Sequence, residues 1–166
     1  MKTLLLFCIM LKSHCCFSQQ RDFSDSIRHI RNLNIQLKTA RYSACYLAGL
    51  LEGRGDKLVH DYPAVKRVHP NMNDQFSDPS ISWRNKWRDG DPRLGEKYIG
   101  SSTVFVPLTD EWHLDKGLSH FFTIAGTIVI TIGGKKSWKY YVKEIAIDYL
   151  LNRAGFYTSY NLLYRN

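Results

Sequence analysis

The sequence predicts a mainly α-helical fold, a compact bundle of about four helices with one long Pro/Trp-rich loop. Three observations carry this prediction. Apolar residues recur at helical spacing on both sides of the middle of the chain, glycines or prolines separate these segments, and the proline-dense stretch lies between them. The chain has 166 residues with no internal repeat and no low-complexity tract, so we expect a single helical domain over residues 19–166.

The first 18 residues have the pattern of a secretory signal peptide. Lys2 supplies the positive start, and an apolar run follows over residues 4–11. This run is too short to span a bilayer, which takes about 20 apolar residues. Ser18 is a small residue before Gln19, where we expect cleavage. We therefore expect an exported protein of the periplasm or the cell-envelope membrane.

Removal of residues 1–18 changes the chemistry of the chain. Three of its four cysteines leave, so Cys45 remains without a disulfide partner and we expect it to be a buried, inert thiol. The formal charge falls from +8 to +6 with the loss of Lys2 and Lys12. Export argues against nucleic acid as a partner. The charge favours membrane lipid or another envelope component, although ordinary solubility explains it equally well.

The first helix is predicted over residues 24–53. Ser24 can cap its start, and Ile27, Ile30 and Leu37 lie on one stripe of a helix. Residues 42–51 are apolar nearly all round, which is typical of a helix buried in protein or in lipid. Gly53 and Gly55 are expected to end the helix, and the basic residues are expected to lie mostly off its stripe. These basic residues are Arg28, Arg31, Lys38 and Arg41.

A long loop is predicted over residues 62–100. Pro63, Pro70, Pro79 and Pro92 interrupt this polar stretch. Proline lacks the backbone N–H and clashes with the preceding turn, so four of them exclude a long regular helix. The loop is therefore expected to be the recognition or packing feature of the domain.

Three further segments follow the loop. Thr109 is expected to cap a helix that begins at Asp110, after a break at Pro107. Residues 118–134 form the next segment, and residues 121–132 within it are uncharged and rich in Thr, Ile and Val, so helix and strand both stay open. Residues 138–164 are predicted to form an amphipathic helix. Its apolar face carries Trp138, Val142, Ile145 and Tyr149, and its other face carries Lys139, Lys143, Glu144 and Asp148.

The location of the domain stays open between membrane and periplasm. Residues 118–134 are the strongest membrane candidate, but they are short for a span and contain a histidine and three threonines. The mean hydropathy of −0.32 argues against a polytopic protein. Short apolar helices with Trp, Tyr and Lys at their ends can still form a membrane-embedded or membrane-associated bundle. A soluble periplasmic helical domain is the alternative.

The predicted loop contains a candidate binding site. Trp83 and Trp87 are four residues apart, as are Arg84 and Arg88, so one helical turn would place each pair together. Tryptophan faces stack on sugars, and arginines bind phosphates, which suggests a carbohydrate or lipid-headgroup platform. The alternative is that the tryptophans fasten the loop to the helical body.

A second candidate site lies near the predicted helix start at residue 110. Asp110 and His113 are neighbours on a helix, with His120 further along, and a carboxylate with two imidazoles can bind zinc or hold a general base. His69 is a second helper. The alternative is a histidine bonded to a nearby acid at a helix start. Asp89, Asp91 and Glu96 lack the spacing of a calcium loop. We expect no cofactor, and an enzyme is the weaker hypothesis.

Four motifs together resemble a family of small exported or membrane proteins of Bacteroidota-type bacteria. They are SWRNKWRDGDP, GSST, LTDEWH and NRAGFYTSY, and the resemblance spans about residues 40–160. It implies a cell-envelope setting and a mostly helical chain, and it implies no activity. The matching positions are Trp83, Asn85, Lys86, Gly90, Pro92, Asp110 and His113.

Three functions are compatible with these features. The first is a non-enzymatic cell-envelope protein that is associated with or embedded in a membrane. The second is a hydrolase of a lipid or cell-wall substrate that uses a metal or acid–base chemistry at Asp110 and His113. The third is a soluble periplasmic binding module for an anionic or sugar ligand at Trp83, Arg84, Trp87 and Arg88.

Overall fold

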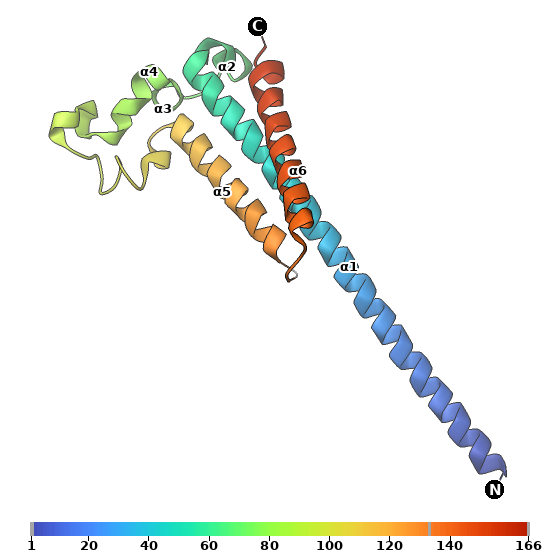
Figure 1. Ribbon diagram of the computed structural model, residues 1–166. Helices are drawn as coiled ribbons and strands as arrows, with labels where there is room; N and C mark the ends of the chain where they lie inside the picture. Colours follow the sequence, from blue (N-terminus) through green and yellow to red (C-terminus); the bar gives the residue numbers. More distant parts are fainter. Residues whose placement is uncertain (1, 133, 166) are drawn as a thin grey trace. The chain divides into compact units, whose positions relative to one another are not determined.

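Helices dominate the computed structural model, which describes residues 2–132 and 134–165, with side chains from residue 25 onward (Figure 1). No strand occurs among these residues, and the one isolated β-bridge there pairs Trp87 with Glu96. The mainly α prediction is therefore confirmed. The long helices of the described part are α1 (Lys2–His60), α5 (Glu111–Thr131) and α6 (Trp138–Tyr157). A π-helical turn, Thr158–Leu163, follows α6.

The chain divides into two compact units, residues 1–39 and residues 40–166. The first unit is helical from Lys2 onward as part of α1. The helix predicted to start at Ser24 instead begins at Lys2, so Ser24 lies inside α1 and does not cap it. Met1 and the side chains of residues 2–24 lie outside the described residues, and the predicted signal peptide stays a prediction. Ile27, Ile30, Leu33 and Ile35 are exposed on this unit.

In the second unit, α1 continues through both glycines that were predicted to end it. The prediction was wrong because Gly53, together with Gly49, serves helix packing, and Gly55 lies inside the same continuous helix. A Cβ atom at Gly49 would lie 1.9 Å from the Asn152 carbonyl oxygen, and one at Gly53 would lie 2.6 Å from that of Phe156. From the other side, a Cβ at Gly155 would lie 2.2 Å from the Tyr46 carbonyl oxygen. The backbones of α1 and α6 therefore touch where no side chain separates them.

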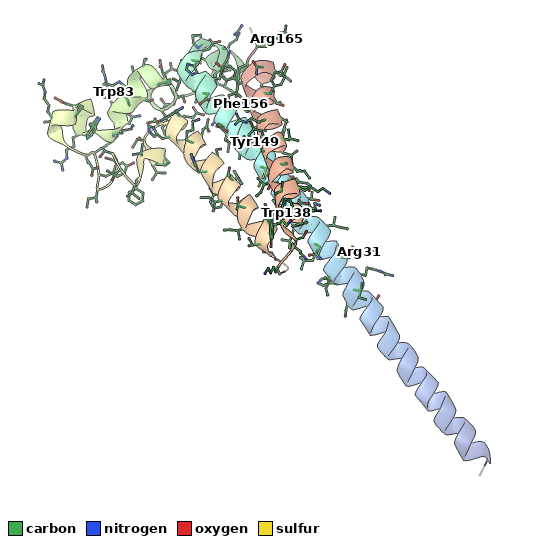
Figure 2. All side chains as sticks on the ribbon, in the orientation of Figure 1. Arg31, Trp83, Trp138, Tyr149, Phe156 and Arg165 are labelled. Atoms are coloured by element: carbon green, nitrogen blue, oxygen red, sulfur yellow. The ribbon has the colours of Figure 1, made fainter. Side chains whose placement is uncertain are left out.

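The predicted polarity of α6 is partly reversed: Lys139 and Lys143 are exposed as predicted, but Glu144 and Asp148 turn inward and the predicted apolar face is exposed. Glu144 is 1 % exposed, whereas Ile145 is 59 % exposed. The side chains of the predicted apolar face stand on the surface of α6, among them Trp138 and Tyr149 (Figure 2). Arg41, which was expected off the packing stripe, is buried and explains the reversal. Its guanidinium pairs with Glu144, and its Nε lies 3.2 Å from an Asp148 carboxylate oxygen.

Helix α5 resolves the ambiguity over residues 121–132 in favour of helix. Its start also corrects the prediction, because Asp110 is the N-cap and Thr109 instead donates from its hydroxyl to the Val106 carbonyl. Gly117 lies inside α5 close to Pro107, since a Cβ atom added to it would lie 3.2 Å from Pro107 Cγ. The Thr123 and Thr127 hydroxyls donate to carbonyls of the preceding turn, which lets these β-branched residues stay helical.

The long loop is folded into short helical turns. Aspartate caps followed by proline start several of them, as at Asp61, Asp78 and Asp91, because proline fits the first helical turn and the carboxylate accepts the free N–H groups. The four prolines do exclude a long helix, as predicted. The turns are α2 (Tyr62–Val68), α3 (Asp74–Ser77), α4 (Pro79–Ser82), and the 3₁₀ turns η1 (Trp83–Lys86), η2 (Arg88–Gly90), η3 (Pro92–Leu94) and η4 (Val106–Leu108).

The buried interior of the second unit is small and unusually polar. A cluster of Leu58, Ala64, Val65 and Tyr164 forms its apolar part, next to α2. Ion pairs occupy much of the rest. Arg54 binds Asp115, which is fully buried, with nitrogen–oxygen distances of 2.9 and 2.5 Å, and it also pairs with Glu111. Among the described residues, no helix combines the length and hydropathy needed to cross a bilayer.

Candidate functional site

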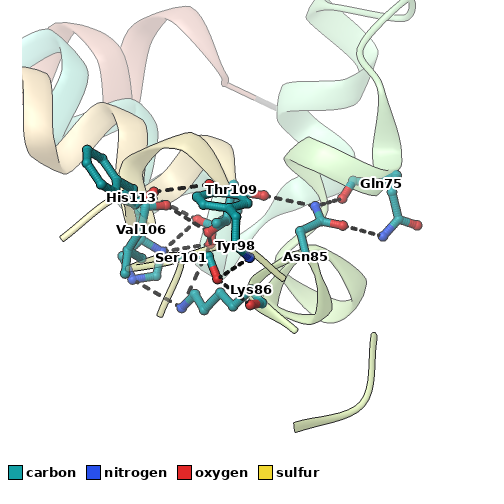
Figure 3. Close-up of polar contacts among 10 residues, drawn as sticks. Gln75, Asn85, Lys86, Tyr98, Ser101, Val106, Thr109 and His113 are labelled. Carbon is teal, nitrogen blue, oxygen red and sulfur yellow. Dashed lines mark hydrogen bonds and ion pairs between the residues drawn. The ribbon is translucent and has the colours of Figure 1, made fainter. Parts of the chain in front are cut away.

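The predicted pair of Asp110 and His113 forms at the start of α5 (Figure 3). Asp110 is buried and accepts two hydrogen bonds from the same residue. One comes from the His113 backbone N–H at 2.9 Å, and the other joins its carboxylate to the imidazole Nδ1 at 2.7 Å. The carboxylate therefore fixes both the helix start and the orientation of the ring.

Lys86, on η1, lies against the other side of this pair. Its Nζ is 3.4 Å from His113 Nε2 and 3.9 Å from an Asp110 carboxylate oxygen. An ammonium group can only donate, so this contact fits a neutral imidazole that donates from Nδ1 to Asp110 and accepts at Nε2. A general base needs a free Nε2, and here Lys86 occupies that position. The three residues form a satisfied polar cluster that joins the loop to α5.

The other proposed ligands do not meet this pair. His120 lies two turns along α5, with its Nδ1 2.6 Å from the Lys116 carbonyl, and His69 lies 3.3 Å from the Tyr164 hydroxyl. The residues with described side chains contain no group of three His, Cys, Asp or Glu side chains placed to hold a metal ion. Asp91 caps η3, and the Glu96 carboxylate accepts from the Gly100 and Ser102 N–H groups, so both have local structural partners.

Asn85, next to Lys86 in the chain, also connects the loop to the segment before α5 (Figure 3). Its amide nitrogen donates to the carbonyls of Gln75 and Thr109 at 2.7 and 2.9 Å, and its amide oxygen accepts from the Gln75 side chain at 2.8 Å. Ser101 is buried and donates from its hydroxyl to the Lys86 carbonyl. One asparagine and one serine thus connect three separate parts of the loop to the start of α5.

A hollow of about 370 Å³ opens beside this network. Of the predicted binding residues, Arg84 and Trp87 line it, and Trp83 and Arg88 do not. The two tryptophans do not share a helical face because η1 ends at Lys86 and Trp87 has an extended backbone. The other lining residues are Gln75, Asn85, Asp89, Gly90 and Lys97.

Trp83 and Arg88 have supporting roles at the edge of this hollow. The Trp83 indole N–H donates to the Ser80 carbonyl, and the Arg84 guanidinium carbon lies 5.5 Å from the centre of the Trp83 ring. Trp83 therefore positions Arg84 through a cation–π contact. Arg88 donates from Nε to the Glu96 carbonyl. The sequence spacing had grouped these four residues on a helix that does not form.

Sequence reasoning missed Gln75 and Lys97 as lining residues, because they lie outside the predicted group of Trp83 to Arg88 and reach the hollow only through the path of the loop. It also missed the buried Arg41–Glu144–Asp148 cluster. The three glycines at 49, 53 and 155 were the available signal, since glycine in an apolar helix can mark a close helix crossing that sets which face turns inward.

A second hollow, of about 470 Å³, lies between α5 and α6 above α1. Ser119 and Thr123 contribute to its α5 wall, and Asp148 and Asn152 to its α6 wall, with Cys45 at its floor. Burial, followed by the negative charge of Asp148, raises the pKa of the Cys45 thiol to about 11. Cys45 is therefore a buried thiol, as predicted.

Comparison of the chain with protein-family models, with curated proteins and with solved structures gives no match. The resemblance to exported proteins of Bacteroidota-type bacteria accordingly stays a prediction from sequence motifs.

Proposed function

We propose that the chain is a non-enzymatic cell-envelope protein, exported by residues 1–18, whose helical body associates with a membrane through α5 and α6. The body in this proposal is a bundle of about four helices, counting the folded loop with α1, α5 and α6. The observation that carries it is on α6, where the charged Glu144 is buried and the apolar Trp138, Val142, Ile145 and Tyr149 are exposed. Large apolar side chains exposed above a buried charge are expected where part of the surroundings is lipid.

The exposed apolar side chains of α5 support the same surroundings. Phe121, Ile124 and Ile128 are each more than half exposed on it, and residues 118–131 extend over about 20 Å at 1.5 Å per residue. This length is below the ~30 Å of a hydrocarbon core. Insertion into one side of a bilayer therefore fits the helix. Trp138, exposed at the start of α6, is suited to the interface between lipid and water.

Flotation of the purified full-length chain with vesicles of phosphatidylcholine and phosphatidylglycerol tests this proposal. We expect the wild-type chain to float with the vesicles. Replacement of Ile124 and Ile145 by serine removes about 1 kcal/mol of apolar transfer each and should lower partitioning about thirtyfold. Ile99→Ser is the matched control, because Ile99 is 92 % exposed on the loop.

Two results would count against membrane association. A wild-type chain that stays with the unbound protein at all vesicle concentrations would contradict it. Equal loss in Ile99→Ser and in the double variant would show that α5 and α6 are not the contact surface. The mass of the N-terminus of the exported chain tests the signal separately, with Gln19 as the expected first residue.

An acid–base hydrolase of a lipid or cell-wall substrate is the second candidate, and the hydrogen bonds between Asp110 and His113 favour it. The position of Lys86 beside Nε2 argues for a structural role instead. His113→Gln separates the two. A structural role is expected to lower the free energy of unfolding, whereas a catalytic role would abolish turnover in a folded chain of unchanged stability.

A further inference from the structure

We propose that the hollow beside Trp87 binds a hydroxyl-bearing phosphate ester of the glycerol phosphate type. The hollow is lined by two cations, Arg84 and Lys97, both exposed. Neither makes an ion pair with a carboxylate of residues 25–132 or 134–165. Seven other basic residues of the second unit make such pairs, namely Arg41, Arg54, Lys57, Lys66, Lys86, Lys116 and Arg153, whereas exposed residues such as Arg88, Arg93, Lys139 and Lys143 do not, so it is the placement of Arg84 and Lys97 in one hollow that distinguishes them.

The walls of the hollow are held in place before any ligand arrives. The Asn85 amide nitrogen donates to the Gln75 and Thr109 carbonyls, and these two hydrogen bonds fix the part of the wall that Asn85 forms. Trp83 holds the Arg84 guanidinium by a cation–π contact. Gly90 lies beside Arg84 and has a φ of +75°, a left-handed conformation that favours glycine and fixes the turn of the chain there. Fixed walls lower the ordering cost of binding.

The lining specifies the class of ligand. A guanidinium with a nearby ammonium matches the oxygens of a phosphate. The Trp87 indole offers an apolar face suited to the C–H groups of a small polyol. Asp89 would repel a bare phosphate but accepts hydrogen bonds from hydroxyls, so the phosphate should carry a hydroxylated group. Asp89 has a φ of 49°, a conformation rare outside glycine that the loop maintains at this site.

This chemistry occurs in a lipid headgroup such as phosphatidylglycerol and in a free or polymeric glycerol phosphate. Titration of the full-length chain with sn-glycerol 3-phosphate, followed by tryptophan fluorescence and by calorimetry, tests the shared chemistry. We expect saturable binding. Arg84→Gln and Lys97→Gln should each weaken it about tenfold or more. Arg93→Gln should change it less than twofold, since Arg93 belongs to the same loop but does not line the hollow.

Asp89→Asn tests whether Asp89 makes the site prefer a hydroxylated phosphate ester to inorganic phosphate. It should reduce the preference for glycerol phosphate over inorganic phosphate. Competition by phosphatidylglycerol vesicles, and none by phosphatidylcholine vesicles, would assign the site to a lipid headgroup. Glycerol phosphate binding without competition would assign it to a free or polymeric ester. Both results support the site.

Two results would overturn the proposal, provided that circular dichroism shows each variant to be folded. One is the absence of saturable binding by both methods. The other is an equal effect of Arg93→Gln and Arg84→Gln, which would reduce the interaction to non-specific charge. The Ile124→Ser/Ile145→Ser variant keeps this test apart from membrane association, because it should lose vesicle flotation and retain binding of soluble glycerol phosphate.

Discussion

Asp110 connects the folded loop to the start of α5 through the contacts of a single carboxylate. It caps α5, orients His113 and lies near the Lys86 ammonium. The spacing of Asp110 and His113 was enough to predict their contact, because residues three apart on a helix are neighbours. Lys86 could not be predicted, since it reaches the pair through the path of the loop rather than through helical periodicity.

Cys45 gives a prediction at this scale. Burial and the charge of Asp148 raise its pKa to about 11, so its thiolate should be about 100-fold scarcer at pH 8 than that of an ordinary cysteine. We expect alkylation by iodoacetamide to be slower by at least that factor. In a full-length chain with Cys8, Cys15 and Cys16 replaced by serine, Cys45 is the remaining thiol, so the rate of alkylation is that of Cys45. The same chain in urea is the control, and fast labelling of the folded chain would contradict the burial.

At the scale of elements, the crossing of α1 and α6 explains why two predictions were wrong, namely the end of α1 and the face of α6 that turns inward. Glycine near the end of an apolar segment predicts a helix end, yet Gly53 lies inside α1 and faces the Phe156 carbonyl. The hydrophobic pattern of α6 likewise predicted the opposite face inward. Both errors arise because tertiary packing of backbone on backbone, and the pairing of Arg41 with Glu144, outweighed local preference.

Two glycine substitutions in α1 should have opposite effects. Gly49→Ala places a methyl group 1.9 Å from the Asn152 carbonyl oxygen and should lower the free energy of unfolding by about 3 kcal/mol. Gly55→Ala is the matched control, because its nearest atom, Asp115 Cβ, lies at 3.4 Å. There, alanine should be neutral or stabilise the helix by up to about 1 kcal/mol. Urea unfolding followed by circular dichroism measures both, and equal effects would argue against a close crossing.

At the scale of the whole molecule, composition and periodicity predicted the mainly helical class correctly, and the prolines of residues 62–100 do exclude a long helix there, although this stretch is folded into short helical turns. Composition and periodicity also predicted that Cys45 is buried. They could not predict which surfaces face inward, because the interior is built from ion pairs such as Arg54 with Asp115, and charged residues ordinarily indicate a solvent face. The hollow at Trp87 was predicted in part, through Arg84 and Trp87. Helical spacing did not point to Asn85, Asp89 and Gly90 of the same motif as lining residues, and Gln75 and Lys97 come from outside the motif.

Substitutions of two neighbouring residues in α6 test whether charged side chains are buried in this molecule while apolar ones are exposed. Glu144→Gln removes one partner of a buried ion pair and should destabilise the chain by about 3 kcal/mol. Ile145→Gln changes an exposed side chain and should shift stability by no more than about 0.5 kcal/mol. Thermal and urea unfolding would give the ranking. The reverse ranking would mean that the apolar face of α6 turns inward after all.

The crossing of α1 and α6 also dictates an order of assembly. Its contacts join residues about a hundred positions apart, as between Arg41 and Glu144, so the C-terminal quarter of the chain must be present before they can form. A chain made or translocated from its N-terminus has α1 long before α6, and the glycine surface of α1 stays uncovered in the interval. A partner that shields this surface from other newly made chains would therefore act before α6 docks and would be released by that docking.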